Sequence, residues 1–439
     1  MAAKGEIISI ETIKPSTPTP DNLREFKLSL LDQLIPHQVY IPLLLCYSHH
    51  DINNAFGGTD DHFSVISQKL KTSLSQALTL YYPYCGTTVK DNLSIDCNDT
   101  GVVFIESKVN ANLSDILIDP LLDVMVNDFF PFDPYNFDEP EANMAVRLNQ
   151  FNCGGIALGV SFNHKLGDAI TTASFLKAWS LIARGQGSIV AAPQMETSNL
   201  YFPPKNFKMP SFRDMLIPED NVTKRFIFSG TNLSRIRDKV SSSNKNLSRV
   251  EAVTALIWKS ALEAAATANS DKEQIIHASK VIHVVGIRGR VDPPLPEVTR
   301  GNLIIQSLSP KLELKGEVGL HDFAEMARKA VRSVDKDYVS KIVGDGILKV
   351  VEEMRASKEE GVPVYTFSSV TRLDYYENDF GWGKPTWLGT VGRRPNKNTI
   401  LLFTSRDGEG TEAWITLPKA EMVEFERNPE ILQYTSVDC

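Results

Sequence analysis

The chain lacks the long apolar run that a membrane-spanning helix needs. Such a helix takes about 20 consecutive apolar residues, and none of the 439 residues belongs to an uninterrupted apolar stretch of that kind. The start, Met1 to Glu6, is not followed by the apolar core of a secretion signal, so we expect a cytoplasmic protein. With 42% hydrophobic and 23% charged residues the composition is that of an ordinary folded protein, and the length fits two domains.

Cysteine and positive charge are also scarce. The chain has five cysteines, an odd number, at positions 46, 85, 97, 153 and 439. This spacing matches neither a disulfide framework nor a zinc site, so we expect reduced thiols and no bound metal. A formal net charge of -8 argues against a broad nucleic-acid surface, which would show a basic excess. An anionic ligand would therefore need a local basic pocket.

One histidine stands where an apolar run gives way to a helical pattern. Residues 155–162 read as a buried strand, His164-Lys165-Leu166-Gly167-Asp168 follows, and residues 171–183 have helical periodicity. Histidine is the side chain that takes and returns a proton near neutral pH, and catalytic groups tend to lie on loops held by a rigid scaffold. His164 is therefore a candidate general base, although a lone histidine beside an apolar run is more often a core residue.

A second segment, Asp379-Phe380-Gly381-Trp382-Gly383, alternates aromatic residues with glycines, which by itself is typical of a buried turn. Taken together and in this order, the two segments resemble the plant BAHD acyltransferase family, whose signatures are His-x-x-x-Asp and Asp-Phe-Gly-Trp-Gly. The similarity covers nearly the whole chain, through residues 28–33, 70–75, 82–83, 153–155, 293–296 and 301–302.

The resemblance implies an α/β fold of two similar mixed-sheet domains, like chloramphenicol acetyltransferase, with the active-site channel between them. Repeated prolines between residues 193 and 218 interrupt helices and central strands, so we predict a crossover linker at 186–225. The N-terminal domain, 1–185, would then carry His-x-x-x-Asp. The C-terminal domain, 226–439, would carry Asp-Phe-Gly-Trp-Gly.

Periodicity also predicts the main elements. Strands are expected at 39–46, 102–105, 145–148, 156–162, 224–228, 281–287 and 401–405, and helices at 63–80, 171–183, 249–268 and 321–335. Asp168 is well suited to cap the second of these helices. Ser248 and Glu251 have capping-box spacing ahead of the third.

The resemblance further implies transfer of an acyl group from a coenzyme A thioester to a hydroxyl. A neutral hydroxyl is a weak nucleophile, so His164 would take its proton and pass it to the departing thiolate, with no covalent acyl-enzyme. Acyl-CoA would be a co-substrate, with no tightly bound cofactor and no macromolecular partner, in a monomer. Residues 163–166 and 201–204 resemble the branch that transfers acetyl to alkaloid or terpenoid alcohols.

Other residues join His164 in the candidate site. Asp168 and Asp379 are the remaining candidate catalytic groups, although a structural role is favoured for both, and the resemblance implies an ion pair between Asp168 and Arg288. The indole N–H of Trp382, with Gly383 beside it, is a candidate to stabilise the oxyanion.

Candidate ligand contacts lie elsewhere in the chain. Ser248 and Arg249, at a helix N-terminus that attracts phosphate, and Lys384 are candidates for binding the coenzyme. Arg372 and Asn302 are candidates for the acceptor alcohol, and the alternative for Arg372 is a surface ion pair.

The chain departs from the family pattern at three places. Gly286 stands where an Asn is common, Thr299-Arg300 replace a Tyr-Phe pair, and Val370 replaces a Trp. We expect these changes to affect substrate fit and to leave the chemistry unchanged.

Alternatives to acetyl transfer stay open. A malonyl or hydroxycinnamoyl donor acting on a phenolic or glycoside is one, a thioester hydrolase a second, and a non-catalytic binding protein a third. Residues 159–163 nearly match the nucleophile elbow of serine hydrolases, but the last glycine is missing, so we do not expect Ser161 to be a nucleophile. Cys153 could also be drawn as a nucleophile, but we expect it to be a small buried residue.

Overall fold

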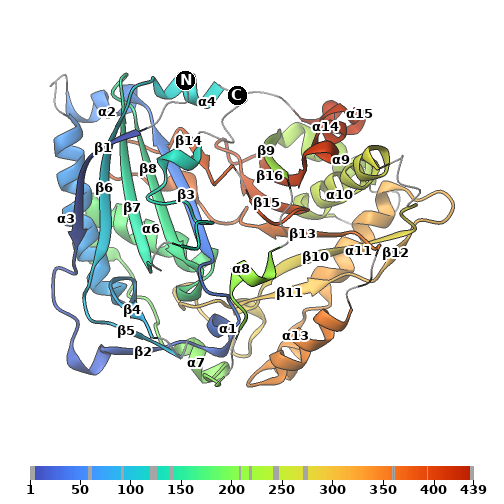
Figure 1. The fold of residues 1–439 in the computed structure, drawn as a ribbon, viewed down its shortest axis with the longest axis horizontal. Coiled ribbons are helices and arrows are strands. Elements are labelled where there is room, and N and C mark those ends of the chain that lie inside the picture. The colour runs from blue at the N-terminus through green and yellow to red at the C-terminus, as the bar shows by residue number, and fades with distance from the viewer. Residues whose placement is uncertain are drawn as a thin grey trace.

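Two large mixed sheets lie side by side, one built mainly from each half of the chain (Figure 1). The computed structural model describes residues 5–57, 62–89, 93–118, 126–138, 142–206, 209–216, 220–240, 247–269, 275–357, 359, 361–392 and 394–435. The α/β fold with two mixed-sheet halves that the sequence predicts is confirmed.

The first sheet has six strands. Their order is β1 (Gly5–Ile13), β6 (Val102–Val109), β7 (Met144–Phe151), β8 (Ile156–Asn163), β3 (Tyr40–Tyr47) and β14 (Trp387–Gly389). Only β6 and β7 are parallel. All eight residues of β8 are buried, as expected of a central strand that reads as a continuous apolar run. Strand β14 comes from the second half of the chain, so the two halves share this sheet.

The second sheet has seven strands. Their order is β11 (Ile304–Leu308), β10 (Ala278–Gly286), β13 (Val364–Ser369), β15 (Thr399–Thr404), β16 (Thr411–Pro418) and β9 (Asn221–Phe228), with β12 (Leu312–Glu313) paired to β10. Strands β10, β13 and β15 run parallel. A small sheet of β2 (Glu25–Lys27), β5 (Ser94–Asp96) and β4 (Thr87–Thr88) lies beside the first sheet.

Helices cover the sheets. Helices α3 (His62–Leu80) and α6 (Ala169–Ala183) pack on each other within the core of the first half, and α10 (Arg249–Ala268), α11 (Leu320–Arg332) and α14 (Lys419–Arg427) within that of the second (Figure 1). The other α-helices within the described residues are α1 (Leu30–Gln33), α2 (His49–Phe56), α4 (Leu113–Ile118), α7 (Thr197–Tyr201), α8 (Phe212–Met215), α9 (Gly230–Val240), α12 (Lys336–Ile342), α13 (Gly346–Ala356) and α15 (Pro429–Tyr434). None of the helices in the described ranges is long and apolar enough to cross a bilayer.

The predicted strands and helices are all present, with ends shifted by a few residues. Both predicted caps are confirmed, because the Asp168 side chain accepts from the N–H of Thr171, and Ser248 and Glu251 form a reciprocal capping box. Strand β9 begins at Asn221, inside the stretch that we assigned to the linker, and α7 and α8 also lie there. The four cysteines within the described residues are free thiols, and Cys439 lies outside them.

Candidate active site

His164 begins the short turn between β8 and α6. Its backbone N–H donates to the carbonyl of Val39 at 2.8 Å, which holds the turn against the start of β3. The side chain of Asn163 accepts from the N–H of Lys165, so the turn is also fixed internally. The imidazole is half-buried. The chain turns here because the apolar strand β8 ends at Asn163, whose side chain can cap the turn, and Asp168 then caps the start of α6.

Asn302, in the second half of the chain, sets the orientation of the His164 ring. Its Oδ1 lies 2.9 Å from Nδ1 of His164, and its Nδ2 donates to the His164 carbonyl at 2.7 Å and to Asp32 at 2.8 Å. Two acceptors on Nδ2 fix which way the amide faces, so Nδ1 of the ring must carry the proton that Oδ1 accepts. The lone pair of Nε2 is then the one that can take a proton from a substrate.

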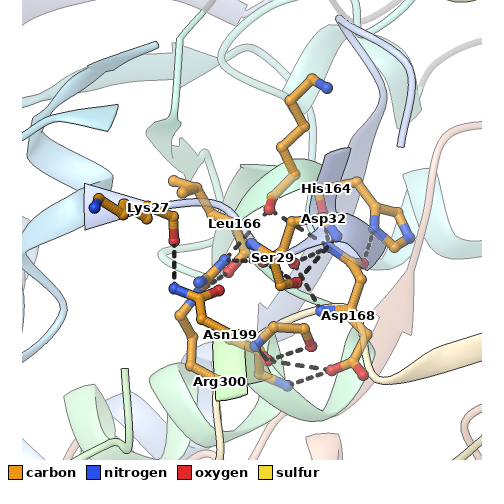
Figure 2. A network of polar contacts seen from close by, with 12 residues as sticks. Lys27, Ser29, Asp32, His164, Leu166, Asp168, Asn199 and Arg300 are labelled. Carbon is orange, nitrogen blue, oxygen red and sulfur yellow. Dashed lines mark hydrogen bonds and ion pairs between the residues drawn. The ribbon is translucent and has the colours of Figure 1, made fainter. Parts of the chain in front are cut away.

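Asp32 lies behind this pair, fully buried in α1 (Figure 2). Oδ1 accepts from the backbone and side-chain nitrogens of Asn302, each at 2.8 Å. Oδ2 accepts from the backbone and hydroxyl of Ser29 and from Nη2 of Arg300, at 2.8 to 3.1 Å. A buried carboxylate with this many donors is fully satisfied, and it forms a second layer that fixes the ring.

Burial lowers the pKa of His164 below its usual 6.5, while the charges of Asp168 and Asp32 and the hydrogen bond to Asn302 oppose that shift. Loss of water disfavours the imidazolium, so the shift favours the neutral ring near neutral pH. A neutral, oriented imidazole with Nε2 available is suited to accept a proton from a bound hydroxyl.

Asp168 points away from the imidazole and forms the predicted ion pair with Arg288. Its two oxygens accept from Nη1 and Nη2 of Arg288 at 2.6 and 3.0 Å, and both side chains are almost fully buried. Arg288 also donates to the carbonyls of Thr299 and Gly301. The pair therefore connects the first turn of α6 to the segment that carries Asn302. Asp168 thus has a structural role, in holding that segment beside the His164 turn.

Asp379 organises its own loop. Oδ1 accepts from the backbone N–H groups of Gly381, Trp382 and Gly383 at 2.7, 3.1 and 3.0 Å, and Oδ2 lies 3.7 Å from Arg184. Gly381 and Gly383 have φ of +108° and +101°, a region that favours glycine. The N–H of Gly383 is thus already used inside the loop, which assigns Asp379 and Gly383 to the architecture of the turn.

Trp382 corrects the expectation of an oxyanion donor. Its ring packs on Tyr47 and Phe56, with centroids 5.9 and 6.3 Å apart, at the end of β3 that pairs with Ile156. His164 follows Asn163, which pairs with Tyr40 at the other end of the same strand. Seven residues of strand span about 23 Å. The indole is therefore buried in the core at the far end of β3 and β8, too far away to serve the oxyanion.

Of the candidate ligand residues, Asn302 contacts His164, whereas Ser248, Arg249 and Lys384 have their hydrogen-bond or ionic partners in other parts of the described structure. Ser248 caps α10, and Arg249 is half-exposed and donates to the Glu409 carbonyl at 3.0 Å. Lys384 is exposed and pairs with Glu377 at 2.7 Å. Arg372 is exposed just after β13. Asn302, which we assigned to the acceptor, is 1% exposed and directs its amide at His164 and Asp32 instead.

Sequence reasoning missed Asp32 and Arg300 as parts of the site. Asp32 lies in residues 28–33, which contribute to the family resemblance but suggest no role for the carboxylate. Arg300 stands out in the sequence only as a departure from the family pattern. A capping-box pattern at Ser29 could have placed Asp32 on a helix, but only the fold brings it beside Asn302. Among the residues that the structure describes, no three His, Cys, Asp or Glu side chains are grouped as metal ligands.

Comparisons with known proteins show which family the chain resembles over nearly its whole length. A family model described as the Transferase family matches residues 3–432. The chain is 37% identical to limonoid 21-O-acetyltransferase of Melia azedarach, with 98% of each chain covered, and 33% identical to stemmadenine O-acetyltransferase of Catharanthus roseus, with 96% of each covered. The crystal structure of vinorine synthase superposes with a TM-score of 0.85 at 31% identity, covering 99% of both chains.

Proposed function

The chain belongs to the Transferase family, the plant BAHD acyltransferases, and is an acyl-CoA-dependent O-acyltransferase; on that premise we propose that it transfers acetyl from acetyl-CoA to a hydroxyl of a polycyclic terpenoid or alkaloid. Relatives named for a limonoid and for stemmadenine support this substrate class, and they favour acetyl over a malonyl or hydroxycinnamoyl donor.

The contact between His164 and Asn302 carries the proposal. With Nδ1 held by Asn302, Nε2 of His164 takes the hydroxyl proton as the alcohol oxygen attacks the thioester carbon. A C–O bond forms, and the tetrahedral intermediate collapses by breaking the C–S bond. The thiolate of coenzyme A leaves and receives the proton from the imidazolium. Both substrates are bound together, and no acyl-enzyme forms.

The position of His164 suits a site reached from both halves of the molecule. The histidine belongs to the first half, whereas Asn302 and Arg288, which hold its turn, belong to the second. We place the substrate channel at this junction, with acyl-CoA as the donor and no tightly bound cofactor. The enzyme would act in the cytoplasm as a monomer. Size-exclusion chromatography with light scattering tests the oligomeric state by measuring the molar mass of the protein in solution.

Two of the departures from the family pattern meet near this junction. Strands β10 and β13 are parallel with Val284 opposite Ser368, and continuing that register by two residues places Gly286 beside Val370. Gly286 is exposed, and a side chain added there would meet no atom within 4 Å. Since both residues are smaller than the Asn and Trp common in the family, they leave room for a bulky acceptor.

Acetyl-CoA with a panel of terpenoid, alkaloid and phenolic alcohols tests the function by release of free thiol. We expect release that depends on the alcohol and is abolished in His164→Ala. His321→Ala is the matched control, because His321 is exposed on α11, and it should keep full activity. Thiol release that is independent of alcohol would instead indicate a hydrolase, and equal release by His164→Ala would overturn the base.

A Gly286→Asn variant tests the acceptor space. If Gly286 borders the acceptor, this variant should raise KM for a polycyclic alcohol while leaving KM for acetyl-CoA unchanged. Gly187→Asn is the matched control, since Gly187 is also exposed, has no left-handed φ, and an added Cβ there would make only an ordinary contact of 3.6 Å with Ile182. Equal effects of the two variants on the acceptor KM would contradict the assignment of Gly286.

A further inference from the structure

Arg300 is a buried charge at a position where the family pattern has an aromatic residue. Its side chain is 3% exposed, and its guanidinium lies over the ring of Phe26 with 4.4 Å to the centroid. Nη2 donates to Oδ2 of Asp32 at 3.1 Å, and Nε donates to the carbonyl of Leu166 at 2.7 Å (Figure 2). A buried guanidinium is costly to desolvate, and an apolar side chain of similar size would usually be at least as stable there. Stability alone therefore does not account for this arginine.

The contacts of Arg300 converge on the turn that carries His164. Leu166 and Lys165, whose carbonyls accept from Arg300, are the two residues that follow the histidine. Asp32, the ionic partner of Arg300, holds the amide of Asn302 with its other oxygen. Arg300 thus reaches His164 by two routes, one through the backbone of the turn and one through Asp32 and Asn302. Together with Arg288 and Asp168, two buried Arg–Asp pairs bracket the turn.

We propose that Arg300 is a positioning residue for acetyl transfer, which holds the His164 turn in place and offsets the charge of Asp32 behind the imidazole. The proposal rests on the role of His164 as the base. It goes beyond that role by assigning a function to a residue in which this chain departs from its family pattern. Arg300 is buried and bonded to the backbone of the turn, so its proposed effect is on the geometry and basicity of His164.

The charges around His164 give the proposal a distinctive readout. Asp168 and Asp32 both raise the pKa of His164, and each is paired with an arginine. The ammonium of Lys165 donates to the Ile35 carbonyl, and Tyr84 lies near Asp32, Asp168 and Arg300. Removing the charge of Arg300 leaves Asp32 uncompensated, although it keeps four donors from Ser29 and Asn302. The unbalanced negative charge favours the imidazolium, so the acid limb of activity moves to higher pH.

The test compares Arg300→Met with Arg328→Met. Arg328 is a matched control because it also forms a buried ion pair, with Glu251 at 3.0 Å, in the α10–α11 core. We expect Arg300→Met to lower kcat about tenfold with unchanged KM values. We also expect its kcat/KM acid limb to shift upward by about one pH unit. Arg328→Met should lose stability while keeping the wild-type pH profile.

Further variants keep the outcomes distinct. Arg300→Lys retains the charge and should restore the position of the acid limb. If Arg300→Met does not fold, Arg300→Gln, which keeps a donor without the charge, is compared with Arg300→Lys in its place. An uncharged variant with the wild-type acid limb overturns the proposal. If His164→Ala keeps alcohol-dependent thiol release, the proposed function itself fails; if His164→Ala is inactive but Arg300→Met keeps the wild-type profile, only the role of Arg300 fails.

Discussion

The two signature segments of the chain lie at opposite ends of β8 and β3, and they join the two halves of the molecule in different ways. At one end, the His164 turn contacts the second half through buried ion pairs and the amide of Asn302. We call this set of residues the polar junction: Asp32, His164, Asp168, Arg288, Arg300 and Asn302. At the other end, residues 379–383 insert two aromatic rings into the core of the first half, here called the aromatic junction. The polar junction holds the imidazole that we propose as the base, whereas the carboxylate of the aromatic junction accepts from three backbone N–H groups of its own loop.

An aspartate stabilises each junction, but by different means. Asp168 has an arginine as its main partner, and the pair bridges two segments that are 120 residues apart. Asp379 has three consecutive backbone N–H groups as partners, all within its own loop. One motif therefore places the proposed base against the second half of the chain, whereas the other organises its own loop. The hydrogen-bond partners of Asp168 and Asp379, and not the sequences of the two motifs, distinguish these two roles.

The largest expected effect comes from breaking the polar junction at Asp168. Asp168→Ala leaves Arg288 buried and unpaired, which should lower the free energy of unfolding by about 4 kcal/mol and reduce activity as the turn loosens. Asp168→Asn keeps an acceptor for the N–H of Thr171 and should lose less. Urea unfolding and kcat per folded molecule measure both effects. A fully folded Asp168→Ala protein that loses only turnover would contradict the structural role.

Breaking the aromatic junction at Asp379 should have a smaller effect, and only on stability. Asp379→Ala removes the acceptor for three N–H groups in a partly exposed loop, at a cost of about 2 kcal/mol. Asp379→Asn keeps an oxygen at that position and should be intermediate. The control is the activity of the folded fraction, which should stay near the wild-type value for Asp379→Asn. A large fall in that specific activity at unchanged stability would make Asp379 a catalytic group.

The pH profile sharpens the contrast further. Burial lowers the pKa of His164, so its neutral form prevails at neutral pH and is lost as the pH falls. We expect an acid limb in kcat/KM below about pH 6.5, with activity falling about tenfold per pH unit. The limb should have the same position in Asp379→Asn, because the aromatic junction lies at the other end of the strands. A limb that moves in this variant would show that the two junctions are coupled.

The sequence could predict the elements that follow a clear period, and the candidate base, but not the partners that orient it. Residues 156–162 and 249–268 have unambiguous patterns, and both appear in the structure. Asp32 and Asn302 are 270 positions apart and meet only because the halves pack together, which no local pattern encodes. Trp382 was misassigned because its distance from His164 depends on strand register. The register of β3 with β8 therefore shows that Trp382 and His164 lie at opposite ends of these strands, which the motif alone does not reveal.

The smallest expected effect comes from Trp382→Phe, which decides between the two roles of the aromatic junction. Within the described residues, the indole nitrogen is buried with no hydrogen-bond partner, so its removal costs no hydrogen bond. Phenylalanine keeps a ring that can pack on Tyr47 and Phe380. We expect a stability change of about 1 kcal/mol or less and a kcat within about twofold of wild type. Loss of an oxyanion donor would instead reduce kcat by about 100-fold or more, so single-turnover rates of this one variant distinguish a packed ring from a catalytic donor.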